Sequence, residues 1–418
     1  MSRVVFIETS LSGSGMAAIR QARSLGCDVT LLTRDLGYYA GRDALAPAEL
    51  HAFATVLPCD TNSAGAVVAA LAGSRVDAVL SAGEYHVEVA AEVAHRLGVP
   101  GLSRSAGHAA RDKVETVRRC VAAGVPVPRQ VAVRAAGEVP PAVHRLGLPL
   151  VVKPVDGTAS VDARLCTTAA EVGESVARIL RRTHNARGQR CARAALLAEY
   201  VRGAEVSVET LSWAGQTAVL GITAKRVGPL PYFVEIGHTF PAPLPEPVAD
   251  RCTGLALAAL DAIGLRHGAA HTELILGPDG PLLLEVNARP AGDQITELVR
   301  LATGIDPLRE WVASHLPGMA PRSAPTRHRA ATIRYLTPPP GVVTAVGDLT
   351  AARQRSGVHR VVLHVAPGDV IAGPRSSHDR PGYVITSAVD PAASAALAES
   401  VQDSLPIEVR APQLVSSA

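Results

Sequence analysis

The sequence predicts an α/β protein that begins with a parallel sheet and continues with antiparallel strands. Over residues 1–100, short apolar runs alternate with helix-like stretches, a pattern typical of parallel strands covered by helices. From about residue 194 onward, apolar runs follow one another across short turns, as they do in hairpins. A chain of 418 residues is also long enough for more than one domain.

The composition is that of a globular protein with few aromatic side chains. Hydrophobic residues make up 47% of the chain and aromatic residues 3%, so we expect cores of Ala, Val and Leu and no aromatic platform for stacking bases. The net charge of +3 comes from mixed acidic and basic residues, which does not suit a nucleic-acid binder. The six cysteines include no CxxC pair, and no apolar stretch approaches the roughly 18 residues of a membrane span. We therefore expect a soluble, cytoplasmic protein without nucleic-acid or membrane partners.

The first section carries the parallel-sheet signals. Apolar runs at 4–7, 29–32 and 76–80 predict strands, and 84–97 predicts a helix that ends at Gly98. The turn Ser12-Gly13-Ser14-Gly15 follows the first strand and precedes a helix that runs to Leu25. Because this turn lacks the third glycine of GxGxxG, we interpret it as a tight strand-to-helix turn rather than a dinucleotide site.

The later sections contain helices, a buried strand and hairpin strands. Residues 112–123 predict a helix, and 149–154 predict a buried strand that ends near Lys153. Antiparallel strands are expected at 196–200, 205–212 and 217–225, with a helix at 249–263. After a proline-rich bridge at 317–325, the run 361–365 predicts a further strand.

The most informative segment is a predicted hairpin at 271–289. A three-residue loop, Pro278-Asp279-Gly280, would place Glu273 directly opposite Glu285 and His271 opposite Asn287. Alternation then puts these four polar side chains on one face of the hairpin.

The opposite face of the hairpin is suited to a core. It would carry Thr272, Leu274, Leu276, Leu282, Leu284 and Val286.

Two carboxylates directly across a ladder repel each other. Their Cβ atoms would lie about 4.5–5.5 Å apart, so a fold keeps such a pair when a cation lies between them or one of them is protonated. Hard divalent cations prefer carboxylate and amide oxygens. Since Arg289 adds a further charge directly after Glu285 and Asn287, we favour a metal site over an exposed polar hairpin.

The run from His271-x-Glu273 through Glu285-Val286-Asn287-Ala288-Arg289-Pro290-Ala291-Gly292-Asp293 resembles the metal-binding signature of ATP-grasp ligases. Within that superfamily it most resembles the bacilysin-type L-amino-acid (dipeptide) ligases, and the similarity is specific over about residues 106–330. The resemblance implies that Glu273, Glu285 and Asn287 hold Mg²⁺, or Mn²⁺ in its place, against the phosphates of ATP. It also implies that Arg289 stabilises the transfer of the phosphoryl group.

Other ATP-grasp elements follow in the expected order. Lys113 opens the second section, and Lys153 ends a strand that leads into a loop with Gly157, Thr158 and Ser160, so these groups are expected to bind phosphate. Asp162 is an unexpected charge beside this loop. The resemblance further implies an ATP-binding hinge and a weaker phosphate ligand. These residues are Glu199, Tyr200, Val201, Glu205 and Lys225.

Rare aromatic residues gather in the segment 231–240, where prolines at both ends favour an extended conformation. In the similar ligases this run lines the amino-acid site, which implies that Glu235 meets an ammonium group and that His238 acts near the acyl phosphate. A structural role for His238 in a packed loop remains the alternative. The remaining predicted substrate-binding residues are Gly237, His271 and Gly292.

The resemblance implies an ATP-dependent carboxylate–amine ligase that forms an acyl phosphate and releases ADP. Its expected substrates are small molecules, amino acids first among them, in a specialised metabolic pathway, and a homodimer is possible. One alternative is transfer of the acyl group to a carrier-protein thiol or to bicarbonate, as in a carboxylase. The other is a nucleotide-sensing protein without turnover, which would normally lack one of the four metal and arginine positions.

The implied fold is an ATP-grasp fold with an N-terminal Rossmann-like domain and a C-terminal α+β lobe. The predicted sections are a Rossmann-like domain at 1–105, a first ATP-grasp subdomain at 106–190, a second subdomain with the metal site at 191–322, and a C-terminal lobe at 323–418.

Overall fold

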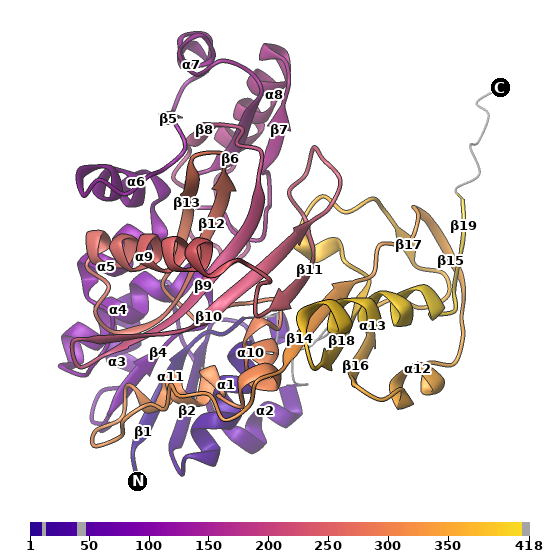
Figure 1. Cartoon of the computed structure of the whole chain (residues 1–418). Coiled ribbons are helices and arrows are strands. Elements are labelled where there is room, and N and C mark those ends of the chain that lie inside the picture. The colour runs from indigo at the N-terminus through magenta and orange to yellow at the C-terminus, as the bar shows by residue number, and fades with distance from the viewer. Residues whose placement is uncertain (11–13, 40–46, 412–418) are drawn as a thin grey trace.

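The structure is a computed structural model that describes residues 1–10, 14–39 and 47–411. Figure 1 shows the N-terminal sheet at the bottom, a long sheet through the centre, a smaller sheet at the top and the C-terminal part to the right. The α/β prediction is confirmed. No helix among the described residues is long and apolar enough to cross a membrane.

The N-terminal section is a parallel sheet in the order β3-β2-β1-β4, as the alternating pattern predicted. Its strands are β1 (Arg3–Ile7), β2 (Asp28–Thr33), β3 (Thr55–Pro58) and β4 (Ala78–Leu80). Its helices are α1 (Ser14–Ser24), α2 (Pro47–Phe53), α3 (Ala64–Ala70) and α4 (Val87–Leu97), with 3₁₀ turns η1 (Leu36–Tyr39) and η2 (Glu84–His86). The predicted turn at 12–15 lies partly outside the described residues, and Ser14 and Gly15 already belong to α1.

Strand β3 was not predicted. It lies at the edge of the sheet and is largely accessible to solvent, so its sequence lacks the continuous apolar run of a buried parallel strand.

The second section is built on a four-stranded sheet in the order β5-β8-β6-β7. Its strands are β5 (Gln130–Val133), β6 (Leu150–Pro154), β7 (Arg164–Cys166) and β8 (Ala195–Glu199). Its helices are α5 (Arg104–Arg111), α6 (Lys113–Ala122), α7 (Val139–Leu146) and α8 (Ala169–Leu180), with the 3₁₀ turn η3 (Ala136–Glu138).

Strand β8 lies beyond the predicted boundary at 190/191, yet it belongs to the sheet that precedes this boundary. It pairs antiparallel with β5 and β6. A strand with apolar residues on both faces gives no local sign of which sheet it joins.

The third sheet has eight strands in the order β13-β12-β9-β10-β11-β14-β18-β16. These are β9 (Ala204–Trp213), β10 (Gln216–Val227), β11 (Glu235–Phe240), β12 (Gly268–Gly277), β13 (Gly280–Asn287), β14 (Ala330–Tyr335), β16 (Val358–Leu363) and β18 (Gly382–Ala388). The helices of this part are α9 (Glu246–Ile263), α10 (Ile295–Thr303), α11 (Pro307–Ala313), α12 (Thr350–Gln354) and α13 (Pro391–Ser404).

The predicted C-terminal lobe at 323–418 is only partly built on a sheet of its own. Its strands β14, β18 and β16 continue the eight-stranded sheet, because β14 pairs with β11 and satisfies the backbone groups of what would otherwise be an edge strand. The rest forms a small sheet of β15 (Gly341–Val346), β17 (Val370–Ile371) and β19 (Ile407–Arg410), with the 3₁₀ turn η4 (Ser377–Asp379). The C-terminal segment is therefore joined directly to the central sheet.

The β12–β13 hairpin has a shorter turn than predicted. Gly277 pairs with Gly280, which leaves a two-residue loop and shifts the register near the turn by one residue. An irregularity next to Glu273 then inserts one residue on β13 and brings Glu273 opposite Glu285 and His271 opposite Asn287. The predicted carboxylate pairing is thus present, although the predicted turn is wrong.

The shift also changes the core face of the hairpin. Leu283, rather than Leu282 or Leu284, joins Leu274 and Val286 in the buried cluster beneath α9. This apolar packing fixes one face of the hairpin, so its acidic residues are presented on the other.

Candidate active site

A cavity of about 880 Å³ lies where the three sheets meet. The side chains that line it come from the N-terminal section, both later sheets and the C-terminal segment. All predicted site residues except Gly237 and His238 line this cavity. They are Lys113, Lys153, Gly157, Thr158, Ser160, Glu199, Tyr200, Val201, Glu205, Lys225, Glu235, His271, Glu273, Glu285, Asn287, Arg289 and Gly292.

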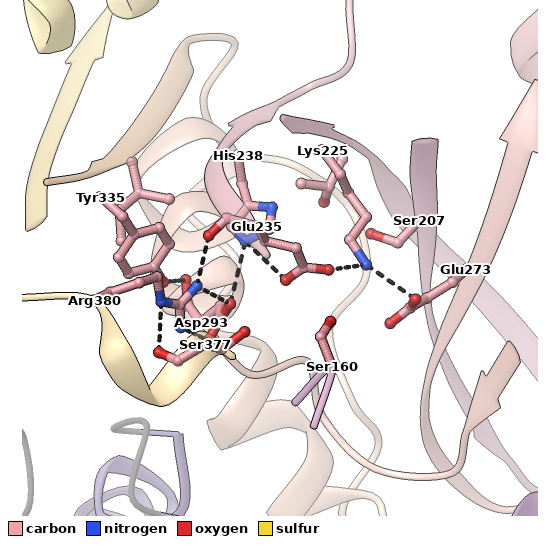
Figure 2. Close-up of polar contacts among 12 residues, drawn as sticks. Ser160, Ser207, Lys225, Glu235, His238, Glu273, Asp293, Tyr335, Ser377 and Arg380 are labelled. Atoms are coloured by element: carbon pink, nitrogen blue, oxygen red, sulfur yellow. Dashed lines mark hydrogen bonds and ion pairs between the residues drawn. The ribbon is translucent and has the colours of Figure 1, made fainter. Parts of the chain in front are cut away.

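The two opposed carboxylates are compensated by lysines from neighbouring elements. Lys225 Nζ lies 3.1 Å from Glu273 Oε2 and also pairs with Glu235, as Figure 2 shows. Lys113 Nζ lies 2.9 Å from Glu285 Oε1. Lys225 is almost fully buried, so it is not a surface lysine.

Glu273 is also held by a buried histidine. His271 lies between two acids, with Nδ1 2.9 Å from Glu209 Oε2 and Nε2 3.1 Å from Glu273 Oε1. Burial would lower the pKa of His271, but Glu209 and Glu273 raise it to about 9. Burial would likewise raise the pKa of Glu273, but Lys225 and His271 hold it well below its usual range. Glu273 is thus a fixed, ionised carboxylate, and His271 orients it.

The donor set fits a hard divalent cation. Two ionisable carboxylates lie opposite each other, and Asn287 Nδ2 lies 3.5 Å from Glu273 Oε1, so an amide is within reach of the same point. Oxygen donors of this kind suit Mg²⁺ or Mn²⁺.

Lys153 is a partly buried cation that faces the cavity and has no ion-pair partner among the described residues. Among the described residues, no carboxylate oxygen lies within 4.0 Å of its ammonium group. Burial lowers the pKa of Lys153, while Glu285 partly opposes that effect. Lys113, in contrast, donates to the carbonyl oxygen of Gly157 at 2.8 Å. An anion that enters beside Lys153 would relieve its desolvation cost.

The loop after β6 has an unusual backbone. Ala159, Ser160 and Asp162 all have positive φ angles, and Ser160 Oγ donates to the carbonyl oxygen of Phe233 at 2.8 Å. Asp162 turns away from the cavity and pairs with Arg178 on α8 at 2.9 Å. Asp162, the unexpected charge in the sequence, therefore holds the loop against α8.

The predicted hinge connects β8 with β9. The N–H of Glu199 donates to the carbonyl oxygen of Arg129 at 2.9 Å, so only the carbonyl of Glu199 is left to contact an adenine edge. The N–H of Val201 donates to no atom of the described residues and lines the cavity. Burial raises the pKa of Glu205 to about 7, and the nearby Glu273 and Glu235 add to this effect.

Arg289 is fixed by an acid that the sequence reasoning missed. Its Nε pairs with Glu84 of η2, and its Nη1 donates to the carbonyl oxygen of Pro290 at 3.0 Å. Glu84 also accepts from Arg111 at 2.8 Å. Burial would raise the pKa of Glu84, but Arg289 and Arg111 lower it to about 2. A signal was available, because Glu84 follows β4 at the carboxyl end of a parallel sheet, where ligands usually bind.

His238 and Gly237 lie on β11 as an extended strand, but neither lines the cavity. His238 is fully buried behind Glu235 and Asp293, with Nε2 3.5 Å from a carboxylate oxygen of each. His238 thus lies one layer below the side chains that face the cavity, and its role near the reacting groups stays a prediction. A Cβ on Gly237 would lie 2.8 Å from the carbonyl of Ile333, so close packing against β14 accounts for this glycine.

Glu235, His238 and Asp293 also place three potential ligand atoms within 4.8 Å of one another. Two cations already neutralise this cluster, since Lys225 pairs with Glu235 and Arg380 pairs with Asp293 at 2.7 Å (Figure 2). The hairpin stays the candidate metal site, because there two carboxylates face each other with the amide of Asn287 within reach. Arg380 was missed as well, and its position far from the motifs gave no sequence signal.

Three family models match separate parts of the chain. Residues 146–297 match an ATP-grasp domain, and residues 19–101 match an ATP-grasp N-terminal domain. Residues 334–410 match L-amino acid ligase C-terminal domain 2.

Similar curated proteins include ligases of amino acids. The chain is 31% identical to the uncharacterized protein y4rH of Sinorhizobium fredii, over 76% of this chain and 65% of that protein. It is 34% identical to carnosine synthase 1 of Gallus gallus, over 69% of this chain and 33% of that protein. It is 30% identical to a D-alanine–D-alanine ligase of Mycolicibacterium smegmatis, over 50% and 59% respectively. The chain thus spans less than two thirds of the length of these relatives.

Solved structures share the fold over nearly the whole chain. The L-amino acid ligase from Bacillus licheniformis superposes with a TM-score of 0.81 at 23% identity, covering 98% of this chain and 99% of that one. The phosphoribosylglycinamide synthetase from Anaerococcus prevotii gives a TM-score of 0.73 at 16% identity, covering 98% and 100%. At these identities the similarity concerns the fold alone.

Proposed function

We propose that this chain, in which residues 146–297 match an ATP-grasp domain, uses ATP to join a carboxylate to an amine, releasing ADP and phosphate. The observation that carries the proposal is the single cavity in which an opposed carboxylate pair, an unpaired lysine and an anchored arginine meet. Amino acids are the proposed substrates on both sides. The match of residues 334–410 to an L-amino acid ligase domain, and the names of two curated relatives, support that choice.

Glu273, Glu285 and Asn287 would hold the divalent cation, for which we propose Mg²⁺, with Mn²⁺ able to replace it. When bound, the cation would neutralise phosphate charge during phosphoryl transfer. Its arrival would also replace the compensation that Lys113 now gives Glu285, which frees that lysine to contact phosphate. His271 keeps Glu273 oriented throughout.

The nucleotide would lie between the two antiparallel sheets. The unbonded N–H of Val201 and the carbonyl of Glu199 would meet the adenine edge. Glu205 would accept from the ribose hydroxyls, while Lys153, Lys225 and the groups at 157–160 would bind the phosphates. Phosphoryl transfer depends mainly on positioning and on charge neutralisation, which these groups supply.

The ligation would proceed in two steps. A carboxylate oxygen of the first substrate attacks the γ-phosphorus, the bond to ADP breaks, and an acyl phosphate forms. The amine nitrogen of the second substrate attacks the acyl carbon, phosphate leaves, and the nitrogen loses a proton. Arg289, whose fork is held by Glu84, would stabilise the charge that develops in these steps. Glu235 would meet the ammonium group of an amino-acid substrate.

A pairwise screen of amino acids with Mg²⁺-ATP tests this function. The productive pair should yield ADP, phosphate and a dipeptide in equal amounts, and EDTA should stop all three. Stoichiometric AMP and pyrophosphate would instead indicate adenylation and overturn the proposal.

A further inference from the structure

One side chain from the C-terminal segment reaches the wall of the cavity and joins two other elements. Arg380 Nη1 and Nη2 form a two-pronged pair with Asp293, at 2.7 and 2.8 Å. Nη1 also donates to the carbonyl oxygen of Glu235 at 3.1 Å, and Nε donates to that of Ser377 at 2.8 Å. Figure 2 shows the guanidinium between these groups and beside Tyr335. Arg380 Cζ lies 3.6 Å from the centroid of the Tyr335 ring. These four partners, like Arg380 itself, line the cavity.

Asp293 needs this support because its backbone is strained. Asp293 and Gln294 have φ angles of 52° and 62°, in the left-handed region that non-glycine residues seldom occupy. Arg380 holds the carboxylate of Asp293, and the hydroxyl of Tyr335 donates to its carbonyl oxygen at 3.0 Å. Such a conformation persists only where surrounding contacts over-determine it.

The strained residue directly follows groups with proposed roles. Arg289 and Gly292 precede Asp293 in the same loop, and all three line the cavity. Glu235, whose carbonyl accepts from Arg380, lies on β11, and its carboxylate lies within 4.8 Å of that of Asp293. Arg380 therefore ties β11 to the 289–293 loop from a third part of the chain.

We propose that Arg380 is a positioning residue for the ligation, which sets the distance between Glu235 and the 289–293 loop and so places the amino-acid substrate against Arg289. This inference rests on the proposed function. The C-terminal segment then contributes a residue to the active site. Lysine could not replace this arginine, because it lacks the planar fork that binds both carboxylate oxygens and stacks on a ring.

The test compares R380A and R380K with R334K as a matched control. Arg334 is also buried on β14 and pairs with Glu399 at 3.3 Å, but it does not line the cavity. For each variant, kcat and the KM values for ATP and for both amino acids are measured, together with Tm. Because Arg380 lines the cavity, R380A is also assayed with guanidinium ion at concentrations that leave the parent's activity unchanged.

We expect kcat to fall on the order of 100-fold in R380A, the scale of a misplacement of about 1 Å, with the KM for ATP unchanged. R380K should be similarly impaired, guanidinium should restore part of the activity of R380A, and R334K should match the parent. The double variant D293A/R380A should show a smaller fall in Tm than R380A alone, because it leaves no uncompensated carboxylate.

Two results would overturn the inference while leaving the proposed function intact. One is parent-like kcat and amino-acid KM in R380A. The other is a loss of Tm and ATP affinity in step with activity, without rescue by guanidinium, which would mark a purely structural residue. A parent that releases no ADP with any pair of amino acids would instead overturn the proposed function, and this inference with it.

Discussion

At the scale of single residues, the site depends on buried charges that compensate one another in pairs. Glu273 is flanked by Lys225 and His271, Glu285 by Lys113, and Glu84 by two arginines. Removing one member of such a pair costs more than the pair contributes, because the remaining charge stays desolvated. Lys153 is the exception, a partly buried cation that faces the cavity without a close carboxylate among the described residues.

The Glu285→Gln variant tests the metal assignment. The substitution keeps the shape of the side chain and relieves the repulsion with Glu273, but it also leaves Lys113 without its carboxylate partner. The protein should still fold, because the cavity leaves Lys113 open to solvent on one side. Turnover should drop by about 100-fold or more, the scale for loss of one preorganised charge-stabilising group. Phosphate release is measured across a Mg²⁺ titration. Glu297→Gln is the control, because Glu297 pairs with Arg300 on α10 away from the cavity. An unchanged kcat in the Glu285 variant would contradict the assignment.

At the scale of elements, the hinge and the hairpin place the chemistry. The hinge turn between β8 and β9 passes close to β12, and a Cβ added to Gly203 would lie 2.2 Å from the carbonyl oxygen of Leu276. That contact is with backbone, which cannot move aside without shifting the strand that carries Glu273. Both the proposed adenine site and the proposed metal site thus depend on this close approach.

The Gly203→Ala variant should therefore raise the KM for ATP and lower Tm. Gly254→Ala is the matched control, because a Cβ on Gly254 meets nothing within 4 Å and the residue lies inside helix α9. There alanine should be neutral or stabilising by about 0.5–1 kcal/mol. Calorimetry and ATP kinetics on the two variants decide the matter. Equal Tm and KM in both would show that the hinge tolerates the shift.

How far the sequence predicts the site is clearest in the hairpin. Alternation and turn chemistry predicted Glu273 opposite Glu285, and the structure has that pair. The turn was nevertheless misjudged by one residue, and a bulge beside Glu273 restored the register. A bulge depends on how a strand twists against its neighbours, and local sequence does not reveal it.

The pairing of residues from distant parts of the chain was not predicted either, although the position of Glu84 after β4 did offer a signal. Glu84 and Arg380 lie far in sequence from the motifs they support, and only the packing of sections brings them to Arg289 and Asp293. His238 shows the converse. The sequence predicted the extended segment that contains it, which is β11 in the structure, but did not reveal that its side chain is buried below the cavity wall.

At the scale of the whole molecule, Glu84 joins separate sections of the chain. It lies after the N-terminal sheet, pairs with Arg111 at the end of α5, and pairs with Arg289 after the metal hairpin. Folding lowers the pKa of Glu84 to about 2, so its charge stabilises the folded state above its usual pKa of 4.5. That contribution is lost as the pH falls from 4.5 toward 2.

The difference in unfolding free energy between the parent and Glu84→Gln should therefore shrink in acid. Between about pH 5 and pH 3.5 we expect it to fall by about 1 kcal/mol, from the linkage between the two pKa values. Urea unfolding of both proteins across this range measures the difference. A difference that is independent of pH would mean that Glu84 is not held ionised by the two arginines.

The measurement that tests the proposed ligation most directly is the fate of a carboxylate oxygen. The first substrate is labelled with ¹⁸O in its carboxylate and turned over with Mg²⁺-ATP and the second amino acid. If an acyl phosphate forms, one labelled oxygen passes to inorganic phosphate while the other stays in the new amide, and mass spectrometry should find labelled phosphate and dipeptide in equal amounts. Unlabelled phosphate beside the dipeptide, or label in AMP, would contradict the account.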